Sequence, residues 1–269
     1  IASGPTFKTF GTSSIMIGDD ATGTINAANY NTGLGVDVFA SLTEGDNKTA
    51  VGFNALTSNT TGAGNTAVGT TALDANTTAD GNTAVGSNAL SANTTGDSNT
   101  GIGLGSLQLN TTGRANTALG NSSLDNNTEG NDNVGVGLNA LDDNTTGDSN
   151  TAVGRSSLAN NTTANNNTAV GYYALEANTT GTGNTAVGQG ALLSNTTADS
   201  VTAVGKDALK TNTTGASNTA VGIGALKLNT TANNNTAVGT NALLVNTGAG
   251  NTAVGDQALD ANTTAGDNT

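Results

Sequence analysis

One short motif repeats along almost the whole chain, and it limits the possible folds more than any other feature. A single unit reads Asn-Thr-Ala-Val-Gly-x-x-Ala-Leu-x-x-Asn-Thr-Thr-Gly-x-x, a period of seventeen. The glycine after Val recurs at this period from Gly18 through Gly35 to Gly239 and once more, one residue early, at Gly255, which gives 15 copies. Such repeats indicate stacked units that each contact only their neighbours.

A unit of this length is too short for a pair of helices, and its residues disfavour a single helix. Each unit contains glycine-centred turns, several Thr and Asn, and few strong helix formers. Thr-Ala-Val has the period of a short strand, and we expect Ala-Leu-x-x to begin a second one before Asn-Thr-Thr-Gly turns the chain. Two strands and two turns form one coil of a parallel β-solenoid. The sequence therefore predicts an all-β solenoid of about fifteen coils, spaced by about 4.8 Å.

The repeat also predicts the domain organisation. Residues 1–13 lack the motif, and we expect a linker or a cap that protects the first coil from edge pairing. Residues 14–269 are predicted to form one continuous solenoid, with irregular first coils over residues 14–47. The chain stops at Asn268-Thr269, the first two residues of a further copy, which predicts a longer parent protein.

Stacking places each residue on its equivalent in the next coil, so each position of the unit forms a row along the stack. We expect the Val/Ile/Leu row and the Leu row to fill the interior as two apolar ladders. The Gly row is expected to hold a backbone conformation closed to other residues. The Asn row of the turn is expected to form an amide ladder and to supply a left-handed corner.

An inward Val would place the Ala of Thr-Ala-Val on the outside, because successive strand residues point to opposite faces. We therefore predict an exposed, uncharged Ala stripe through which copies of the chain associate, as a homotrimer. The alternative is a monomer whose Ala stripe stays exposed to solvent. The predicted stripe comprises Ala67, Ala84, Ala152, Ala169, Ala186, Ala203, Ala220 and Ala237.

The composition excludes several functions. The chain has no His and no Cys, so the commonest general base, thiol nucleophiles and the usual zinc ligands are missing. A net charge of −13 with only 7 Lys and Arg disfavours nucleic acid and anionic membranes as partners. No apolar run approaches the roughly 20 residues that span a membrane. We predict a chain without enzymatic activity, cofactor or metal.

Three binding or modification hypotheses remain from the repeat itself. Calcium could bind a loop position that holds Asp80, Asp97, Asp148 and Asp199, although other coils carry unrelated residues there. The Thr rows could order water as an ice-binding surface, although adjacent Thr60 and Thr61 point apart in an extended segment. Asn-Thr-Thr also matches the N-glycosylation acceptor pattern. Outward turns would carry glycans at Asn59, Asn76, Asn93, Asn110, Asn144, Asn161, Asn178, Asn195, Asn212, Asn229 and Asn262.

The motif resembles two known groups of repeat proteins. Asn65-Thr66-Ala67-Val68-Gly69 and its copies resemble the head repeats of YadA-type trimeric autotransporter adhesins, whose unit is shorter. The fuller pattern, from Asn218 through Leu226 to Asn229-Thr230-Thr231, resembles repeat regions of phage and bacterial tail-fibre-like proteins. The resemblance covers about residues 14–269 and implies a left-handed parallel β-roll, a trimer and a role as a fibre or adhesin shaft.

Together these observations predict a non-enzymatic structural or adhesive fibre segment, extracellular, on a cell surface or a virion. Its expected partners are copies of itself and a cell-surface glycan. Two alternatives stay open: a polymerising, N-glycosylated extracellular filament, and an ice- or carbohydrate-binding module that uses Thr and Asn ladders.

Overall fold

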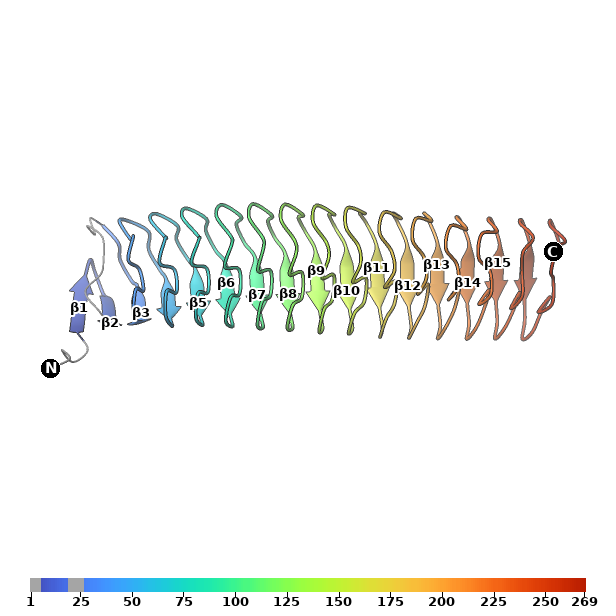
Figure 1. Ribbon diagram of the computed structural model, residues 1–269, viewed down its shortest axis with the longest axis horizontal. Coiled ribbons are helices and arrows are strands. Elements are labelled where there is room, and N and C mark those ends of the chain that lie inside the picture. Colours follow the sequence, from blue (N-terminus) through green and yellow to red (C-terminus); the bar gives the residue numbers. More distant parts are fainter. Residues whose placement is uncertain (1–5, 19–26) are drawn as a thin grey trace. The chain divides into compact units, whose positions relative to one another are not determined.

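The computed structural model describes residues 6–18 and 27–269, which contain strands and turns and no helix. The chain divides into two compact units, Ile1–Asp132 and Asn133–Thr269, and each consists of stacked coils (Figure 1). The predicted all-β parallel solenoid is confirmed, with equivalent residues of successive regular coils seventeen positions apart.

Every regular coil contributes one three-residue strand. The first unit contains β1 (Thr6–Phe10), β2 (Ser14–Gly18), β3 (Thr32–Gly35), β4 (Thr49–Val51), β5 (Thr66–Val68), β6 (Thr83–Val85), β7 (Thr100–Ile102) and β8 (Thr117–Leu119). The second unit contains β9 (Val134–Val136), β10 (Thr151–Val153), β11 (Thr168–Val170), β12 (Thr185–Val187), β13 (Thr202–Val204), β14 (Thr219–Val221), β15 (Thr236–Val238) and β16 (Thr252–Val254).

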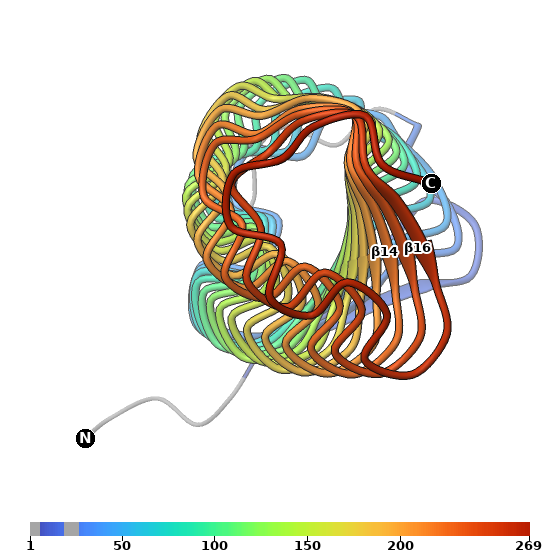
Figure 2. The same ribbon diagram turned by 90° about the vertical axis from the view of Figure 1, so that its right-hand side faces the viewer.

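Within each unit the strands pair in chain order and in register. In the β11–β12 pair, Thr lies beside Thr, Ala beside Ala and Val beside Val. The other parallel pairs keep this register, with different residues in some strands, as where Gly101 lies beside Ala84. The exception is β1, which pairs antiparallel with β2. It therefore covers the free edge of β2, the first of the parallel strands. The arrows of the second unit point down in Figure 1. The labelled β14 and β16 lie on the right in Figure 2, where later coils face the viewer. The second unit therefore winds with a left hand.

The predicted second strand of each coil is wrong. The Leu of Ala-Leu-x-x has a left-handed backbone, with φ of 53° at Leu56 and 54° at Leu175, and this conformation does not continue a strand. The left-handed corner that we expected at Asn therefore lies at Leu. The turned segment still bonds to the next coil, because the Leu175 N–H donates to the Ala191 carbonyl at 3.0 Å.

The predicted orientation of Thr-Ala-Val is also wrong. The Ala row is fully buried, while the Val row is half-buried or exposed, as Val85 is at 36 %. The eight residues of the predicted outer stripe line the interior: Ala67, Ala84, Ala152, Ala169, Ala186, Ala203, Ala220 and Ala237. The physical reason is volume, because the interior already holds the Leu row, a second Ala row and two Asn rows.

The coil at Gly33 shows how tightly this interior is packed. Phe39 replaces the interior Leu there, and Gly33 replaces the interior Ala. A Cβ added at Gly33 would lie 3.1 Å from the Phe39 ring and 3.0 Å from Val38. A larger residue in one row is therefore accommodated by a smaller one in the other, as close packing requires.

The predicted role of the Gly row is confirmed. Gly188 has a φ of 132°, and a Cβ at this position would lie 2.7 Å from the backbone of Gly205 in the next coil. Only glycine permits this close approach of successive coils.

The predicted amide ladder of the turn Asn is confirmed too. The Asn195 side chain donates to Asn178 Oδ1 at 2.9 Å and to the Ala198 carbonyl at 3.1 Å, and it accepts a hydrogen bond from Asn212 Nδ2 at 3.2 Å. A second interior ladder is formed by the Asn before each strand, in which Asn184 accepts from the Val201 N–H at 2.9 Å. These two ladders satisfy the polar groups of a narrow interior, except at Asn59, whose side-chain nitrogen and oxygen have no partner.

Candidate functional site

The outer surface of each sheet is a flat face made by two rows, here named the Thr/Val face. Residues two apart on a strand share one face, so the Thr and the Val of Thr-Ala-Val both point outward. In the first unit the face comprises Thr49, Thr66, Thr83, Thr100 and Thr117 with Val51, Val68, Val85, Ile102 and Leu119. In the second unit it comprises Val134, Thr151, Thr168, Thr185, Thr202, Thr219, Thr236 and Thr252 with Val136, Val153, Val170, Val187, Val204, Val221, Val238 and Val254.

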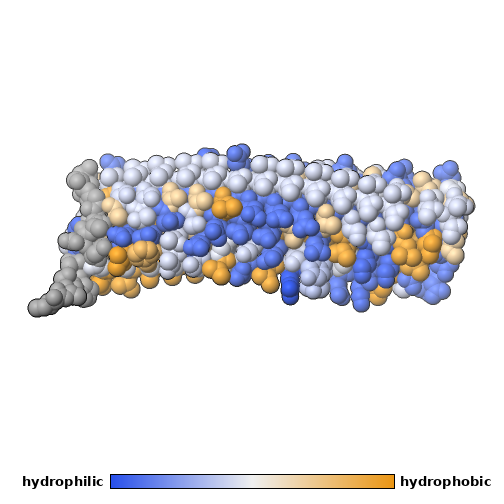
Figure 3. All heavy atoms as spheres, in the orientation of Figure 1, coloured by the Kyte–Doolittle hydropathy of each residue, from blue (hydrophilic) through white to orange (hydrophobic). Residues whose placement is uncertain are grey.

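The Thr/Val face carries no charge in either unit, although the chain has a net charge of −13. Its Val row accepts Val, Ile and Leu, with Leu119 exposed at 47 %. The row that directly follows the Gly row is mixed instead: equivalent positions of three coils hold Arg155, Tyr172 and Lys206. Figure 3 displays such mixing, with hydrophilic and hydrophobic patches below a pale band. The first Thr row of the turn, as at Thr60 and Thr230, is also uncharged, so the sheet face is distinguished by an uncharged Thr row and an apolar row on the same strands.

The predicted glycan acceptors do not lie on the outside of the turns. Ten of them are fully buried: Asn59, Asn76, Asn93, Asn110, Asn144, Asn161, Asn178, Asn195, Asn212 and Asn229. Nine of these bond within the amide ladder, whereas the Asn59 side chain has no hydrogen-bond partner. Asn262 is half-buried and donates to Asn246 Oδ1 at 3.2 Å. The outward placement is wrong because the nitrogen that would accept a glycan lies in the interior, and in most coils it donates to the ladder. A folded coil cannot present it to a modifying enzyme.

The two Thr residues of the turn have different surroundings. The Thr196 hydroxyl donates to the Thr213 carbonyl in the next coil at 3.3 Å, whereas Thr197 is exposed. The expectation that adjacent Thr residues point apart therefore holds. A two-row face of hydroxyls and methyls nevertheless exists on the sheet, where Thr lies beside Val.

The Asp row that suggested calcium has a structural role. Asp199 Oδ1 accepts the Thr182 backbone N–H of the previous coil at 2.6 Å, and Asp97 Oδ1 accepts that of Asp80 at 2.9 Å. No group of three or more possible metal ligands occurs among the residues that the structure describes.

One buried cation interrupts the second Asn ladder of the first unit. Lys48 replaces an Asn and is only 1 % exposed, and its ammonium donates to the carbonyls of Gly45 at 2.6 Å and Gly62 at 3.0 Å. Burial lowers the pKa of Lys48 to about 8, although the charges of Asp46 and Asp80 raise it. The ammonium replaces amide donors at the start of the regular stack.

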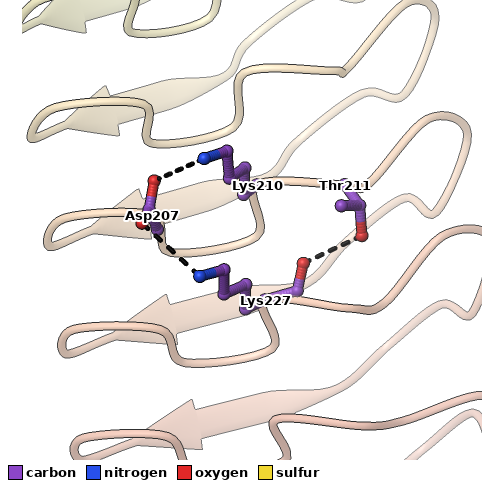
Figure 4. Close-up of polar contacts among 4 residues, drawn as sticks. All are labelled: Asp207, Lys210, Thr211 and Lys227. Carbon is purple, nitrogen blue, oxygen red and sulfur yellow. Dashed lines mark hydrogen bonds and ion pairs between the residues drawn. The ribbon is translucent and has the colours of Figure 1, made fainter.

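A second charged cluster joins neighbouring coils on the surface (Figure 4). Asp207 lies between Lys210 of its own coil, at 3.1 Å, and Lys227 of the next coil, at 3.6 Å. Burial raises the pKa of Asp207, but the hydrogen bonds and charges of the two lysines outweigh it, so the pKa lies below its usual value. Half-exposed pairs of this kind contribute little to stability.

No family model, curated protein or solved structure matches this chain. Within the described part of the chain, no helix has the length and apolar character needed to cross a membrane. The geometry of the coil therefore carries the functional argument.

Sequence reasoning missed the Thr/Val face because it assigned Val to the interior. A usable signal was present. In regular coils the Ala row contains only Ala and Gly, whereas the Val row varies among three sizes. An interior row tolerates size changes less than an exposed one.

Proposed function

We propose that this chain is a non-enzymatic structural segment of an extracellular fibre, whose copies associate as a homotrimer through the Thr/Val face. The observation that carries the proposal is the absence of charge from two adjacent outward rows in every regular coil of an acidic chain. The partly exposed row of Val, Ile and Leu supports an interaction site, because soluble proteins rarely expose extended apolar patches. A charged row there would oppose the approach of an identical copy.

The repeated coil also supports a structural role. Within each unit, backbone bonds join successive coils and the buried amide ladder adds to them, as between Asn178 and Asn195. Such a stack resists bending and local opening, because every coil shares its polar groups with both neighbours. The chain would serve as a spacer on a cell surface or a virion.

Analytical ultracentrifugation of the chain tests the assembly. We expect a discrete trimer of the 26.0 kDa chain. The double variant Val187→Glu/Val204→Glu should dissociate it, because two carboxylates per copy would enter the interface. The matched control Thr180→Glu/Thr197→Glu places the same charges on the exposed turn and should leave the trimer intact. A wild-type monomer at all concentrations would refute self-association, and open-ended polymers would favour the filament alternative.

A second candidate is binding of ice by the same face, favoured by the observation that Thr and Val rows lie side by side. Regularly spaced hydroxyls and methyls at about 4.8 Å intervals could order water. This candidate requires a monomer with a free face. Thermal hysteresis that Val187→Glu abolishes would support it, and the absence of thermal hysteresis in a monomeric wild type would remove it.

A further inference from the structure

Two adjacent tyrosines form an aromatic pair on the second unit. The ring centroids of Tyr172 and Tyr173 lie 4.0 Å apart with an interplanar angle of 47°, and Tyr172 is 42 % exposed. The whole chain has only three tyrosines and no tryptophan. Two of its few large aromatic side chains therefore lie together at the surface of one coil.

Tyr173 occupies a backbone position that disfavours it. Its φ is 56°, and the equivalent residues of the neighbouring coils are Ser156 and Gly190. A left-handed conformation costs a bulky residue about 1–2 kcal/mol. The Leu row offsets this cost by complete burial, but Tyr173 is only half-buried. The same position is left-handed in other coils too, with φ of 55° at Thr71 and 56° at Asp207, so the coil imposes this conformation and Tyr173 accepts it without complete burial.

Parallel register places polar groups directly beside the pair. Arg155 lies one coil before Tyr172, and the Tyr173 N–H donates to its carbonyl at 3.1 Å. Gln189 lies one coil after Tyr172, and Lys206 one coil further. Gly190, which follows Tyr173 in its row, adds no side chain over that position, and its N–H donates to the Tyr172 carbonyl at 3.0 Å.

The charge around the pair differs from that of the chain. Four of the seven cations lie between residues 155 and 227. Lys210 and Lys227 bind Asp207, whereas Arg155 and Lys206 form no ion pair among the described residues. Those two cations flank Tyr172 over three coil steps, roughly 14 Å. Glu176 of the Tyr172 coil adds one carboxylate nearby.

We propose that Arg155, Tyr172, Tyr173, Gln189 and Lys206 form a binding site for an acidic oligosaccharide, a function beyond that of a structural segment. The tyrosine rings would pack against the C–H face of a sugar ring. The paired N–H donors of the Arg155 guanidinium match the two oxygens of a carboxylate. Lys206, three coil steps from Arg155, supplies a second positive charge. The Gln189 amide can donate to and accept from hydroxyls. The distance between the two cations fits several sugar units better than one.

Calorimetric titration with tetragalacturonate tests the site, and its fully methyl-esterified form is the matched neutral ligand. Tyrosine fluorescence gives a second readout, because two of the three tyrosines lie in the site. We expect saturable binding of the acid and roughly tenfold weaker binding of the ester. Tyr172→Ala and Arg155→Ala should each weaken binding of the acid roughly tenfold, as loss of an anchoring contact does.

Phe53→Ala is the matched control, because Phe53 occupies the Tyr172 position of another coil and is similarly exposed. It should leave the affinity unchanged. Absence of binding up to millimolar ligand, or unchanged binding by Tyr172→Ala with an unchanged circular dichroism spectrum, would overturn the proposal. Equal affinity for acid and ester would overturn the role of Arg155 and Lys206. None of these outcomes depends on the oligomeric state, which ultracentrifugation reports separately.

Discussion

Removing one amide from the interior ladder should destabilise the second unit by several kcal/mol. In Asn195→Ala, Asn178 Oδ1 loses the donor that lies at 2.9 Å, and one Nδ2 hydrogen of Asn212 loses its acceptor at 3.2 Å. Asn212 keeps a second acceptor, the Gly215 carbonyl. Each buried group left without a partner costs about 1–3 kcal/mol. The two together predict a loss of roughly 2–6 kcal/mol.

Urea denaturation followed by far-ultraviolet circular dichroism measures this loss as a shift of the midpoint. Hydrogen exchange should also show lost protection in the coils on either side of residue 195, because a repeat stack opens locally. The matched control is Ser194→Ala, next in the chain but half-exposed, which should change the free energy of unfolding by less than about 0.5 kcal/mol.

A second variant separates lost hydrogen bonds from a lost side-chain volume. Asn195→Leu copies the chain itself, where Leu42 occupies the same row and is fully buried. If hydrogen bonds dominate, the Leu variant should be destabilised about as much as the Ala variant. A loss below about 1 kcal/mol for Asn195→Ala would refute the argument that the amide ladder stabilises the coil.

Three further predictions concern single positions. Val201 interrupts the second ladder, so Val201→Asn should restore an acceptor for the Asn218 N–H and raise the urea midpoint, by about 1 kcal/mol of unfolding free energy. Gly188→Ala should cost at least about 3 kcal/mol in the same assay, whereas Gly183→Ala, which has open space around its Cβ, should cost about 1 kcal/mol. Lys48 has a folded pKa of about 8, below its usual 10.5, so the unfolded state binds more protons and stability should rise from about pH 8 to pH 10.5; Lys48→Met should abolish this rise.

The period of the sequence predicted most of the fold. The regular spacing of the Gly and Asn rows gave the coil, its register and the amide ladder, because stacking identical units satisfies identical groups. Even the shortened turn after Asn246 preserves the ladder, since the Asn251 N–H donates to Asn235 Oδ1 at 2.9 Å, 16 residues away.

The error at the Leu row comes from a backbone conformation that local sequence does not reveal. The hydrophobicity and the strand propensity of Leu175 do not reveal a left-handed backbone. That conformation costs such a residue about 1–2 kcal/mol in isolation. Here the Leu175 N–H bonds to Ala191 of the next coil and the side chain is fully buried. Tertiary packing therefore overrides the local preference, and only the stacked coil contains that information.

The Ala and Val rows show how the candidate site follows from the size of the coil. Hydrophobicity ranks Val above Ala for the interior, but the interior leaves little room beside the Leu row, since even a Cβ at Gly101 would lie 3.4 Å from Leu90 Cδ1. Val is therefore outside for lack of space, which explains why it can vary to Ile102 or Leu119 without disturbing the core. Lack of space does not explain why no charged residue enters that exposed row. In-register stacking supplies one reason, because a charged row would place like charges directly beside one another in neighbouring strands. Ultracentrifugation of Val187→Glu/Val204→Glu tests whether contact with another copy supplies a second.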